Sequence, residues 1–371
     1  MDILIDKKKC LIVSSSNIQN VRIRKTLFQF LKNKFDQVNF CGGGLAEEFE
    51  HQIEWEDANF RKGIFFEFII FYRLFLLIRN NKPTHLISFA PKVNIYCGIL
   101  VRVFNIKHAA VISGLGSYSA NITRRGSILF NLFKFSLKKT DLILTMNESN
   151  FRFCEETLGI DKVRKIPSEG LNTNVMLSNN SIDKNKVSIL YLSRIISEKG
   201  IFLLIEAFKN LHVIYPDTEL LIAGEMSLSE ESGETDLFFD KIKSSGINYL
   251  GEVSEELKVQ LLEQSDIVVL ASMYGEGLPM ILLEAQLFRS IIITTNVPGC
   301  CDAVSPAMQK FHCDYTADSL ETNLIKALNL TDEERKFITG NSSSWVKENH
   351  DINHVNLVYD SCFSEKSFYS I

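Results

Sequence analysis

The sequence contains no long uninterrupted apolar run. Its most apolar helical stretch, FFEFIIFYRLFLLIR at 65–79, is broken by Glu67 and Arg73 and falls short of the roughly 20 apolar residues that span a bilayer. The first ten residues, MDILIDKKKC, carry charges where a signal peptide needs an apolar core. We therefore expect a cytoplasmic protein. The 65–79 helix is a candidate membrane-surface element, but packing in the core is the preferred interpretation.

The sequence also lacks the patterns of structural metal sites and of nucleic-acid binding. Its eight cysteines are scattered, with no Cys-x-x-Cys pair and no matching histidine spacing, so we expect reduced thiols and no zinc. A formal charge of −5 argues against nucleic acid as a partner, because duplex-binding domains are normally basic. The 46% apolar content over 371 residues predicts a globular chain with room for two domains.

Two common phosphate-binding fingerprints are missing. No Gly-x-x-x-x-Gly-Lys-Ser/Thr motif occurs, which argues against a P-loop nucleotide hydrolase. GLGSYS at 114–119 and GEGLPM at 275–280 begin like the dinucleotide motif Gly-x-Gly-x-x-Gly, but Ser119 and Met280 stand at the third glycine. We therefore do not expect a nicotinamide or flavin enzyme.

Short β-branched runs alternate with helix-length segments along most of the chain, which is typical of βαβ units on a parallel sheet. The pattern lapses at 168–186, SEGLNTNVMLSNNSIDKNK, which we interpret as a connection between domains. We predict an α/β fold of two doubly wound, Rossmann-like halves facing a central cleft, with ligands at the carboxyl ends of the strands. The predicted strands are 10–16, 37–43, 85–90, 108–113, 141–146, 163–167, 187–193, 219–225, 247–253, 266–272 and 290–295.

The stretch YGEGLPMILLE at 274–284 follows a predicted buried strand and leads into an apolar helix. Pro279 suits the first helical position, so the amides of Gly277 and Leu278 would lie at a helix N-terminus, a site for an anion or for sugar hydroxyls. Glu276 and Glu284 are offset along the direction of the helix axis. The two carboxylates can therefore accept hydrogen bonds from hydroxyl groups in two different parts of an extended ligand. The alternative is that Glu276 is a solvated turn residue and Glu284 a surface charge.

The stretch YLSRIISEKG at 191–200 follows the first strand of the second half. It places Arg194 and Lys199 at the carboxyl end of that strand. Arginine can hold a phosphate through two hydrogen bonds and lysine supplies a compact charge, so the two could neutralise a diphosphate without a metal. The alternative is a solvated loop in which Glu198 pairs with Lys199.

LSRIISEKG, LLIAGE, INYLGEVS, EGLPMILLE and VPGC occur in this order over 187–302, which resembles the donor half of glycosyltransferase family 4, retaining enzymes of the GT-B fold. The resemblance implies that Arg194 and Lys199 hold the donor diphosphate. It implies further that Glu276 binds the transferred sugar and Glu284 the ribose. Gly277, Leu278 and Pro279 would approach the sugar and phosphate through their backbone, and Glu276, Arg194 and Lys199 would be the catalytic residues.

The resemblance implies an acceptor-binding domain at 1–170, a donor-binding domain at 171–344 and a C-terminal helix, 345–371, that packs back on the first domain. SFAPKVNIYCGILVRVFNIKHAAVISGLGSYS at 88–119 is similar to bacterial transferases that extend undecaprenyl-diphosphate-linked sugars. On that basis Lys92, Gly114 and Gly116 would line the acceptor side, against the alternative of a solvated lysine. His350 and His354 have helical spacing that suits a metal, but a solvated helix is the preferred interpretation.

The chain departs from the family pattern in three places. Ser113 and Gly114 stand where many members have a histidine near the cleft. Arg289 and Ser290 replace the usual Gly-x-Pro, and Cys301 replaces a basic residue. These changes bear on the donor pocket and hence on the identity of the sugar.

A basic and apolar segment, TRRGSILFNLFKFSLKKTD at 123–141, reads as a membrane-surface helix. Its contact residues would be Arg124, Arg125, Lys138 and Lys139. The alternative is a helix packed on the sheet with lysines in solvent at its end, because its apolar residues do not keep to one clean face. Membrane contact would suit a lipid-linked substrate, and we expect a peripheral location on the inner face of the cell membrane.

The sequence as a whole predicts a retaining hexosyltransferase. It would move a hexose or N-acetylhexosamine from a nucleotide sugar, most simply a UDP-sugar, to a lipid-linked saccharide in O-antigen or capsule assembly, with an α-linkage. No Asp-x-Asp motif occurs, so we expect no metal and no cofactor. The alternatives are a nucleotide-sugar epimerase of the same fold and an inactive membrane-peripheral assembly partner.

Overall fold

The computed structural model divides the chain into two compact units. Unit 1 comprises Met1–Gly170 together with Ile352–Ile371, and unit 2 comprises Leu171–Asp351. The residues that the structure describes are 8–14, 25–42, 52–54, 63–114, 126–174, 186–243, 246–273 and 276–364.

Unit 1 is built on a seven-stranded sheet in the order β3-β2-β1-β4-β5-β6-β7, in which every described pairing is parallel. The chain runs outward from β1 in one direction and then from β4 in the other, so the carboxyl ends of β1 and β4 mark a switch point in strand order. The strands are β1 Lys9–Ser14, β2 Gln37–Gly42, β3 Gln52–Glu54, β4 His85–Phe89, β5 Lys107–Ile112, β6 Leu142–Thr145 and β7 Val163–Lys165.

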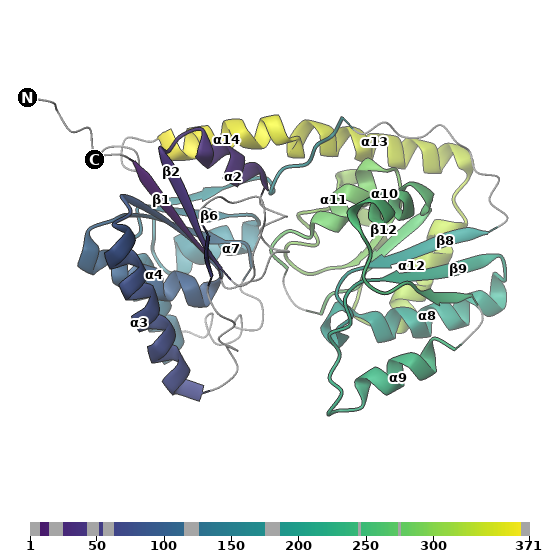
Figure 1. Cartoon of the computed structure of the whole chain (residues 1–371). Coiled ribbons are helices and arrows are strands. Elements are labelled where there is room, and N and C mark those ends of the chain that lie inside the picture. The colour runs from purple at the N-terminus through teal and green to yellow at the C-terminus, as the bar shows by residue number, and fades with distance from the viewer. Residues whose placement is uncertain are drawn as a thin grey trace, which may run out of the picture. The chain divides into compact units, whose positions relative to one another are not determined.

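Helices cover both faces of this sheet. Figure 1 shows α2 and α14 on one face and α3 and α4 on the other. Strands covered on both faces read as continuous apolar runs, as β5 and β6 do. The helices are α2 Lys25–Lys32, α3 Gly63–Asn81, α4 Pro91–Phe104, α6 Ile128–Leu137, α7 Glu148–Arg152 with a π-helical continuation at Phe153–Thr157, and α14 Ile352–Ser364.

Unit 2 has a six-stranded parallel sheet in the order β10-β9-β8-β11-β12-β13, with its switch point between β8 and β11. Its strands are β8 Val187–Leu192, β9 Thr218–Ala223, β10 Ile247–Tyr249, β11 Ile267–Leu270, β12 Ile291–Thr295 and β13 His312–Cys313. Its α-helices are α8 Ile201–Ile214, α9 Glu234–Lys241, α10 Glu255–Gln264, α11 Met280–Leu287, α12 Ala317–Leu328 and α13 Asp332–His350.

The prediction of two doubly wound parallel halves is confirmed, and each predicted strand is present with shifted ends. β10 stops at Tyr249, well before residue 253, because Gly251 takes a left-handed conformation with φ of 71° and turns the chain. The sequence did not reveal β3 and β13, which are three and two residues long.

The single terminal helix predicted over 345–371 is wrong. α13 ends at His350 and α14 begins at Ile352, so the two histidines at 350 and 354 lie in different helices. Between them lies Asp351, the last residue of unit 2, whose Oδ2 accepts a hydrogen bond from Thr173 Oγ1 at 2.5 Å. His350 is buried rather than solvated, and among the described residues no group of three metal-ligating side chains occurs.

α14 packs back on unit 1, as the sequence predicts for the end of the chain. The rings of Phe30 in α2 and Tyr359 in α14 lie 5.8 Å apart. Lys34 donates to Asp360 at 2.5 Å beside them. No helix among the described residues is long and apolar enough to cross a membrane.

A close approach between two helices of unit 1, α4 and α6, leads to a stability prediction. A Cβ on Gly98 of α4 would lie 2.5 Å from the backbone oxygen of Ser136 in α6, so Gly98→Ala must push the helices apart. We expect a loss of about 1–3 kcal/mol in the free energy of unfolding of unit 1.

Gly340 in α13 is the matched control, because a Cβ there meets no atom within 4 Å and the glycine is also helical. Gly340→Ala should stabilise unit 2 by about 0.5–1 kcal/mol through helix propensity. Urea unfolding followed by circular dichroism measures both. Equal effects of the two substitutions would contradict the close helix contact.

Candidate functional site

The predicted donor residues gather at the switch point of unit 2, where β8 and β11 end side by side. The two strands pair in parallel, with Ile189 opposite Ile267 and Leu190 opposite Val268. The loops that follow them therefore leave the same edge of the sheet. An anion or sugar site is expected at this position in an open α/β sheet.

The loop after β8 lies directly against the end of β11. Gly200 takes a φ of 75°, and a Cβ there would lie 2.1 Å from the backbone oxygen of Ala271, so only glycine fits. Met273 N donates to the Glu198 oxygen at 2.8 Å, which joins the two loops a second time. Lys199, between Glu198 and Gly200, is thereby held over the carboxyl end of β11.

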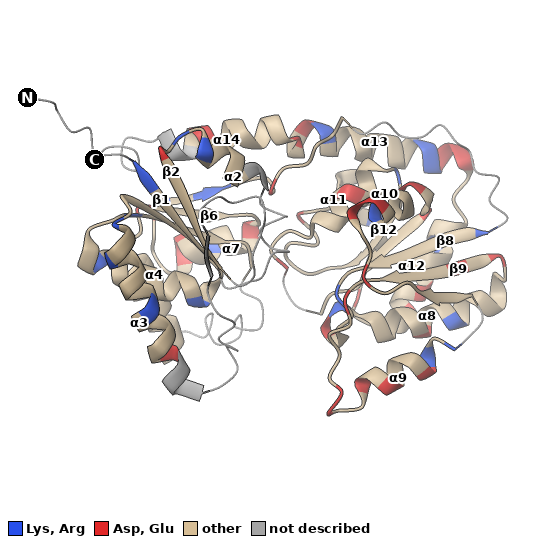
Figure 2. Cartoon of the chain, in the orientation of Figure 1, with Lys and Arg blue, Asp and Glu red and all other residues tan. Residues whose placement is uncertain are grey.

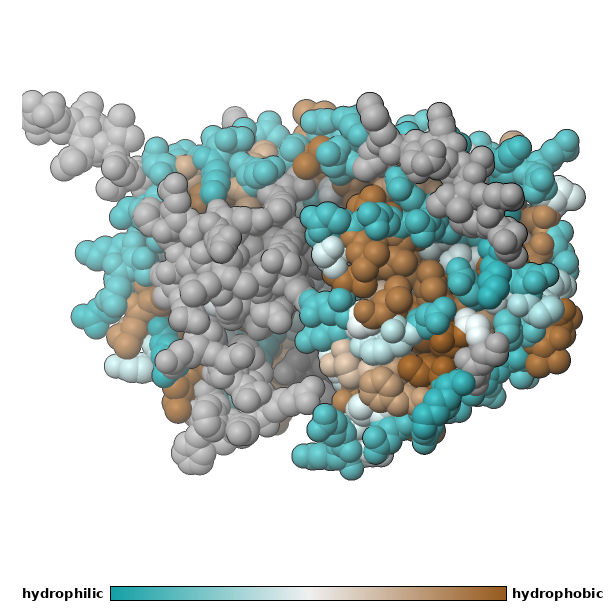
Figure 3. All heavy atoms as spheres, turned by 45° about the vertical axis from the view of Figure 1, so that its right-hand side comes forward, coloured by the Kyte–Doolittle hydropathy of each residue, from teal (hydrophilic) through white to brown (hydrophobic). Residues whose placement is uncertain are grey.

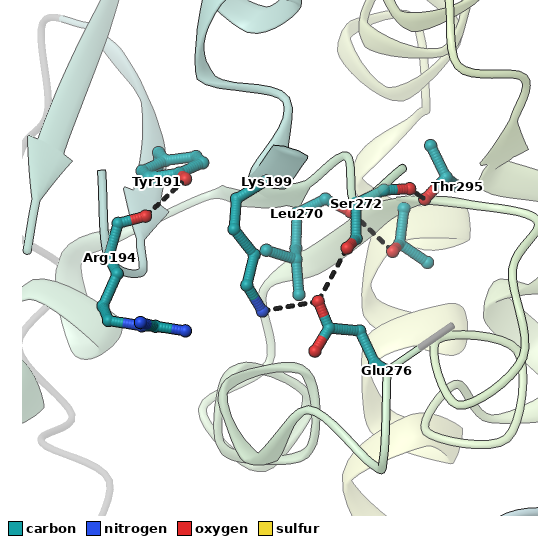
Figure 4. Close-up of polar contacts among 8 residues, drawn as sticks. Tyr191, Arg194, Lys199, Leu270, Ser272, Glu276 and Thr295 are labelled. Atoms are coloured by element: carbon teal, nitrogen blue, oxygen red, sulfur yellow. Dashed lines mark hydrogen bonds and ion pairs between the residues drawn. The ribbon is translucent and has the colours of Figure 1, made fainter. Parts of the chain in front are cut away.

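Lys199 and Glu276 form a nearly buried ion pair. Lys199 Nζ lies 2.5 Å from Glu276 Oε1, and the two side chains are only 12% and 13% exposed. Ser272 Oγ donates to the same carboxylate oxygen at 2.6 Å (Figure 4). The readings of Glu276 as a solvated turn residue and of Lys199 as a partner of Glu198 are therefore wrong.

Hydroxyl groups of β12 fix the backbone from which Ser272 projects. Thr294 Oγ1 donates to the Leu270 oxygen and Thr295 Oγ1 to the Ser272 oxygen, each at 2.6 Å (Figure 4). These threonine side chains are buried. They satisfy backbone carbonyl groups at the end of β11 and just beyond it, where the sheet ladder ends.

Gly299, in the VPGC stretch, holds the turn that carries Glu276. Its φ is 84°, and a Cβ there would lie 2.3 Å from the Glu276 backbone oxygen and 2.7 Å from that of Gly277. The backbone of this loop therefore presses directly on the Glu276 turn. Tyr274 and Gly275, just before it, lie outside the described residues.

α11 begins one residue later than predicted. Met280 is its first helical residue and Pro279 is the N-cap, with an extended ψ of 106°. A proline suits the cap as well as the first turn, because neither position needs its missing N–H for a helical hydrogen bond. Gly277 and Leu278 form the approach to this helix N-terminus, and Leu278 is buried.

Arg194 is the second cation at this edge. Tyr191, fully buried in β8, donates its hydroxyl to the Arg194 backbone oxygen at 3.1 Å and so fixes the start of the loop. The Arg194 side chain is exposed, and the described residues give its guanidinium no hydrogen bond or ion pair. Figure 4 shows it extending to the side on which the Lys199 ammonium lies.

Glu284 pairs with a lysine that sequence reasoning missed. Lys258 Nζ, in α10, lies 3.0 Å from Glu284 Oε1 and 2.7 Å from Glu255 Oε2. Burial raises the pKa of Glu284, although Lys258 acts in the opposite direction. Burial lowers the pKa of Lys258, but the two carboxylates outweigh it and the net shift is upward. With a side chain 21% exposed, Glu284 is not the surface charge of the alternative reading.

The acceptor-side residues lie in unit 1. Lys92, in the first turn of α4, pairs with Glu67 of α3, which also accepts from the Tyr96 hydroxyl. Its side chain is 14% exposed, so the reading as a solvated lysine is wrong. Ala90, at the carboxyl end of β4, has a φ of 77°, which is rare and strained for a residue other than glycine. Gly114 follows β5, and its role stays a prediction.

The remaining predicted residues divide into two groups. Gly116, Arg124 and Arg125 lie outside the described residues. Lys138 and Lys139 are exposed and follow the last residue of α6. Buried residues of α6 belong to the core, so the apolar content of this segment has a packing role as well as a surface role.

His108 in β5 is the histidine that precedes Ser113, the position at which the family resemblance leads us to expect one. It is fully buried, with Nε2 at 2.8 Å from Ser88 Oγ and Nδ1 at 3.0 Å from Thr140 Oγ1. Burial lowers the pKa of His108 to about 3. It is a neutral core residue and does not supply the missing cleft histidine.

The part of the chain that contains this site matches a family of known proteins. Residues 174–343 match the family described as Glycosyl transferases group 1. An N,N'-diacetylbacillosaminyl-diphospho-undecaprenol alpha-1,3-N-acetylgalactosaminyltransferase of Campylobacter jejuni is 26% identical over 64% of this chain and 65% of its own length. A lipopolysaccharide 1,2-N-acetylglucosaminetransferase of Salmonella typhimurium is 24% identical over 52% of this chain and 50% of its own. The chain thus spans about half to two thirds of these relatives.

Solved structures match almost the whole chain. Anabaena Alr3699/HepE, solved in complex with UDP and glucose, has a TM-score of 0.78 at 13% identity and covers 96% of this chain and 99% of its own. Sucrose-phosphate synthase of Thermosynechococcus elongatus has a TM-score of 0.76 at 14% identity, with 96% and 98% covered. These likenesses assign the chain the GT-B fold.

The buried ion pair predicts a coupled effect on stability. Lys199→Met leaves the Glu276 carboxylate without its cation, and we expect it to lower the free energy of unfolding of unit 2 by about 1–3 kcal/mol. The double variant with Glu276→Met should lose less than the sum of the single variants, because it leaves no unpaired charge.

Urea unfolding of the four proteins of this cycle measures the coupling. Lys243→Met, which removes an ion pair with Asp240 between exposed side chains, is the control and should leave the unfolding midpoint unchanged. Additive effects of the two single substitutions would exclude a direct interaction between Lys199 and Glu276.

Proposed function

We propose that the chain is a retaining glycosyltransferase that moves a hexose or N-acetylhexosamine from a nucleotide sugar to a lipid-linked saccharide, with an α-linkage. The observation that carries this proposal is the Lys199–Glu276 pair at the switch point of unit 2, with Arg194 beside it. This arrangement offers cations for a diphosphate and a carboxylate for sugar hydroxyls within one site. The match of 174–343 to a glycosyltransferase family supports it.

In the proposed reaction the bond between the sugar and the diphosphate breaks, and negative charge grows on the leaving diphosphate. Fixed cations aimed at that charge stabilise the transition state, most strongly where water is excluded. Arg194 has its guanidinium available for two parallel hydrogen bonds to phosphate oxygens. Lys199 has three N–H donors, so it can contact a phosphate while it keeps Glu276.

Glu276 has two functions in this proposal. It balances Lys199 in the ligand-free protein, and it accepts hydroxyl hydrogen bonds from the transferred sugar when the donor binds. Glu276 lies next to Lys199. The transferred sugar would therefore be held by Glu276, and the diphosphate from which it departs would be held by the adjacent Lys199. Catalysis without a metal stays a prediction, and it is checked by turnover in the presence of a chelator.

Glu284 would accept hydrogen bonds from the ribose, with Lys258 as its positioning residue. Lys258 contacts Oε1 of Glu284 and leaves the other carboxylate oxygen for a ligand. By holding a cation against a buried carboxylate, Lys258 keeps Glu284 ionised at a lower pH than burial alone would allow. An ionised carboxylate accepts hydroxyl hydrogen bonds more strongly than a neutral one.

We further propose that the acceptor is an undecaprenyl-diphosphate-linked saccharide of bacterial surface-polysaccharide assembly, used at the inner face of the cell membrane. The name of the Campylobacter jejuni relative includes diphospho-undecaprenol, and that of the Salmonella typhimurium relative refers to lipopolysaccharide. The strained Ala90 beside Lys92, at the switch point of unit 1, supports an acceptor site there, with Gly114 at the end of the next strand.

Two alternative functions would treat a nucleotide sugar differently. A nucleotide-sugar epimerase would convert the donor without an acceptor. An inactive assembly partner would bind no nucleotide sugar. UDP is the first nucleotide to test, because the structurally similar HepE was solved with UDP and glucose.

The roles of Glu276 and Arg194 are tested by comparing the affinity of the protein for UDP with its affinity for UDP-sugars. Glu276→Gln replaces a charged hydroxyl acceptor by a weaker, neutral one and frees the charge of Lys199. We therefore expect it to keep or tighten UDP binding while it reduces the preference for one UDP-sugar over UDP. Arg194→Ala should weaken UDP and the UDP-sugar alike, by about 10-fold or more.

Isothermal titration of UDP, UDP-glucose, UDP-galactose, UDP-N-acetylglucosamine and UDP-N-acetylgalactosamine measures these affinities. No binding of any UDP compound by the wild-type protein would exclude the UDP-sugar proposal. Conversion of the donor without an acceptor would favour the epimerase.

The role of Lys258 predicts a shift in pH dependence. Protonation of Glu284 weakens its acceptor strength, so UDP affinity should fall as the pH drops through the folded-state pKa of Glu284. Lys258→Met removes the cation that lowers this pKa, so the fall should begin at higher pH, whereas Lys258→Arg should restore the wild-type profile. Titration of UDP across a pH series measures this shift. If Lys258→Met instead lowered the UDP affinity equally at every pH, Lys258 would have only a structural role.

A further inference from the structure

Among its described residues, unit 1 exposes large apolar side chains almost entirely on one helical layer. α4 packs between α3 and α6 in this layer, and Arg102 Nη2 of α4 donates to the Phe135 oxygen of α6 at 2.5 Å. Among the described residues of unit 1, one other large apolar side chain is exposed, Leu357 on α14. The exposed apolar side chains of the α3–α4–α6 layer are Phe68, Ile69, Tyr72, Val103, Ile128, Leu132 and Phe135.

The two outer helices of this layer are apolar on both their faces. In α6, Ile128, Leu132 and Phe135 recur at i, i+4 and i+7 and are exposed by 87%, 38% and 50%, while Phe130 and Phe133 are buried. α3 shows the same division between an exposed face, which carries Phe68 and Tyr72, and a buried one. Core packing therefore accounts for the buried and partly buried apolar side chains of these helices and leaves the exposed ones unexplained.

The same layer is strongly basic in a chain whose net charge is −5. The three helices and the two residues that follow α6 contain one acidic residue, Glu67, and it is paired with Lys92. Figure 2 shows the basic positions along α3 and α4. The basic residues of the layer are Arg73, Arg79, Lys92, Arg102, Lys134, Lys138 and Lys139.

Unit 2 also exposes apolar side chains, and on two of its helices, α9 and α10, they lie in acidic surroundings. Figure 3 shows apolar patches on the described surface of this unit between hydrophilic side chains. Leu237 and Phe239 are exposed on α9, and Leu257 and Val259 on α10. α9 contains three acidic residues against one lysine, and so does α10. The exposed apolar groups of α9 and α10 therefore lie on helices with an excess of acids, whereas those of the α3–α4–α6 layer lie on helices with an excess of basic residues.

We propose that the α3–α4–α6 layer docks on an anionic lipid bilayer. Lysine and arginine bind the phosphate headgroups, while the aromatic and aliphatic side chains enter the boundary between headgroups and acyl chains. A second copy of the same face is a poor occupant, because two such basic surfaces repel each other. The inference takes its biological purpose from the proposed lipid-linked acceptor, but its physical basis is independent of the donor site.

Vesicle binding by the full chain tests the electrostatic part. We expect sedimentation with vesicles of phosphatidylglycerol and phosphatidylcholine, and little with phosphatidylcholine alone. Lys138→Gln with Lys139→Gln should weaken the binding by about 30-fold, since each basic residue near an anionic surface contributes about 1 kcal/mol. Lys336→Gln with Lys347→Gln, two exposed lysines of α13, is the matched control and should leave it unchanged.

A pair of matched aromatic residues tests the apolar part. Phe68 on α3 is 68% exposed and Phe337 on the acid-rich start of α13 is 70% exposed. Phe68→Trp should show a blue-shifted emission when anionic vesicles are added, and Phe337→Trp should not. Phe68→Ser should weaken vesicle binding, whereas Phe337→Ser should have no effect.

The outcomes separate this inference from the proposed function. Absence of vesicle binding by the wild-type protein, or equal losses in the α6 and α13 variants, would overturn the docking surface. UDP titration of the same proteins reports on the donor site alone and should be unchanged in every surface variant. Vesicle binding without UDP binding would overturn the proposed function and leave the docking surface in place.

Discussion

The ion pair between Lys199 and Glu276 is the interaction around which the candidate site is built. Each charge is removed from most of its water, and a buried charge without a partner is costly, so neither side chain could stand there alone. Two glycines make the arrangement possible. Gly200 lets the Lys199 loop touch the end of β11, and Gly299 supports the Glu276 turn from the other side.

On the proposed function this pair also selects for the intact donor. A ligand with a phosphate but no sugar could draw Lys199 away from Glu276, and the carboxylate would then lose part of its compensation. A sugar without a phosphate would engage Glu276 and leave the two cations with nothing to bind. A nucleotide sugar offers hydroxyls and diphosphate together, so it satisfies both charges at once.

The sequence was informative where function depends on residues close together in the chain, and it failed where tertiary packing decides. The Glu276-to-Glu284 spacing and the β8 loop are local patterns, so they could be predicted. Lys258 could not, because α10 meets Glu284 only in the folded unit. The helix break at 351 has no proline or glycine to mark it, and contacts from Thr173 and Leu171 accompany it instead. The 123–141 segment could be read as core or as surface, and the structure shows both on one helix.

If the α3–α4–α6 layer docks on a membrane as proposed, net charge is a poor guide to where this protein binds. A chain of −5 should be repelled by an anionic membrane if all its charges acted together. At physiological ionic strength, however, charges are screened beyond about 8 Å, so a membrane in contact with one helical layer interacts mainly with the charges of that layer. Within the α3–α4–α6 layer the balance is positive, and apolar side chains beside the cations add a short-range attraction that salt does not screen. On this proposal the local composition, and not the net charge, determines the face that binds.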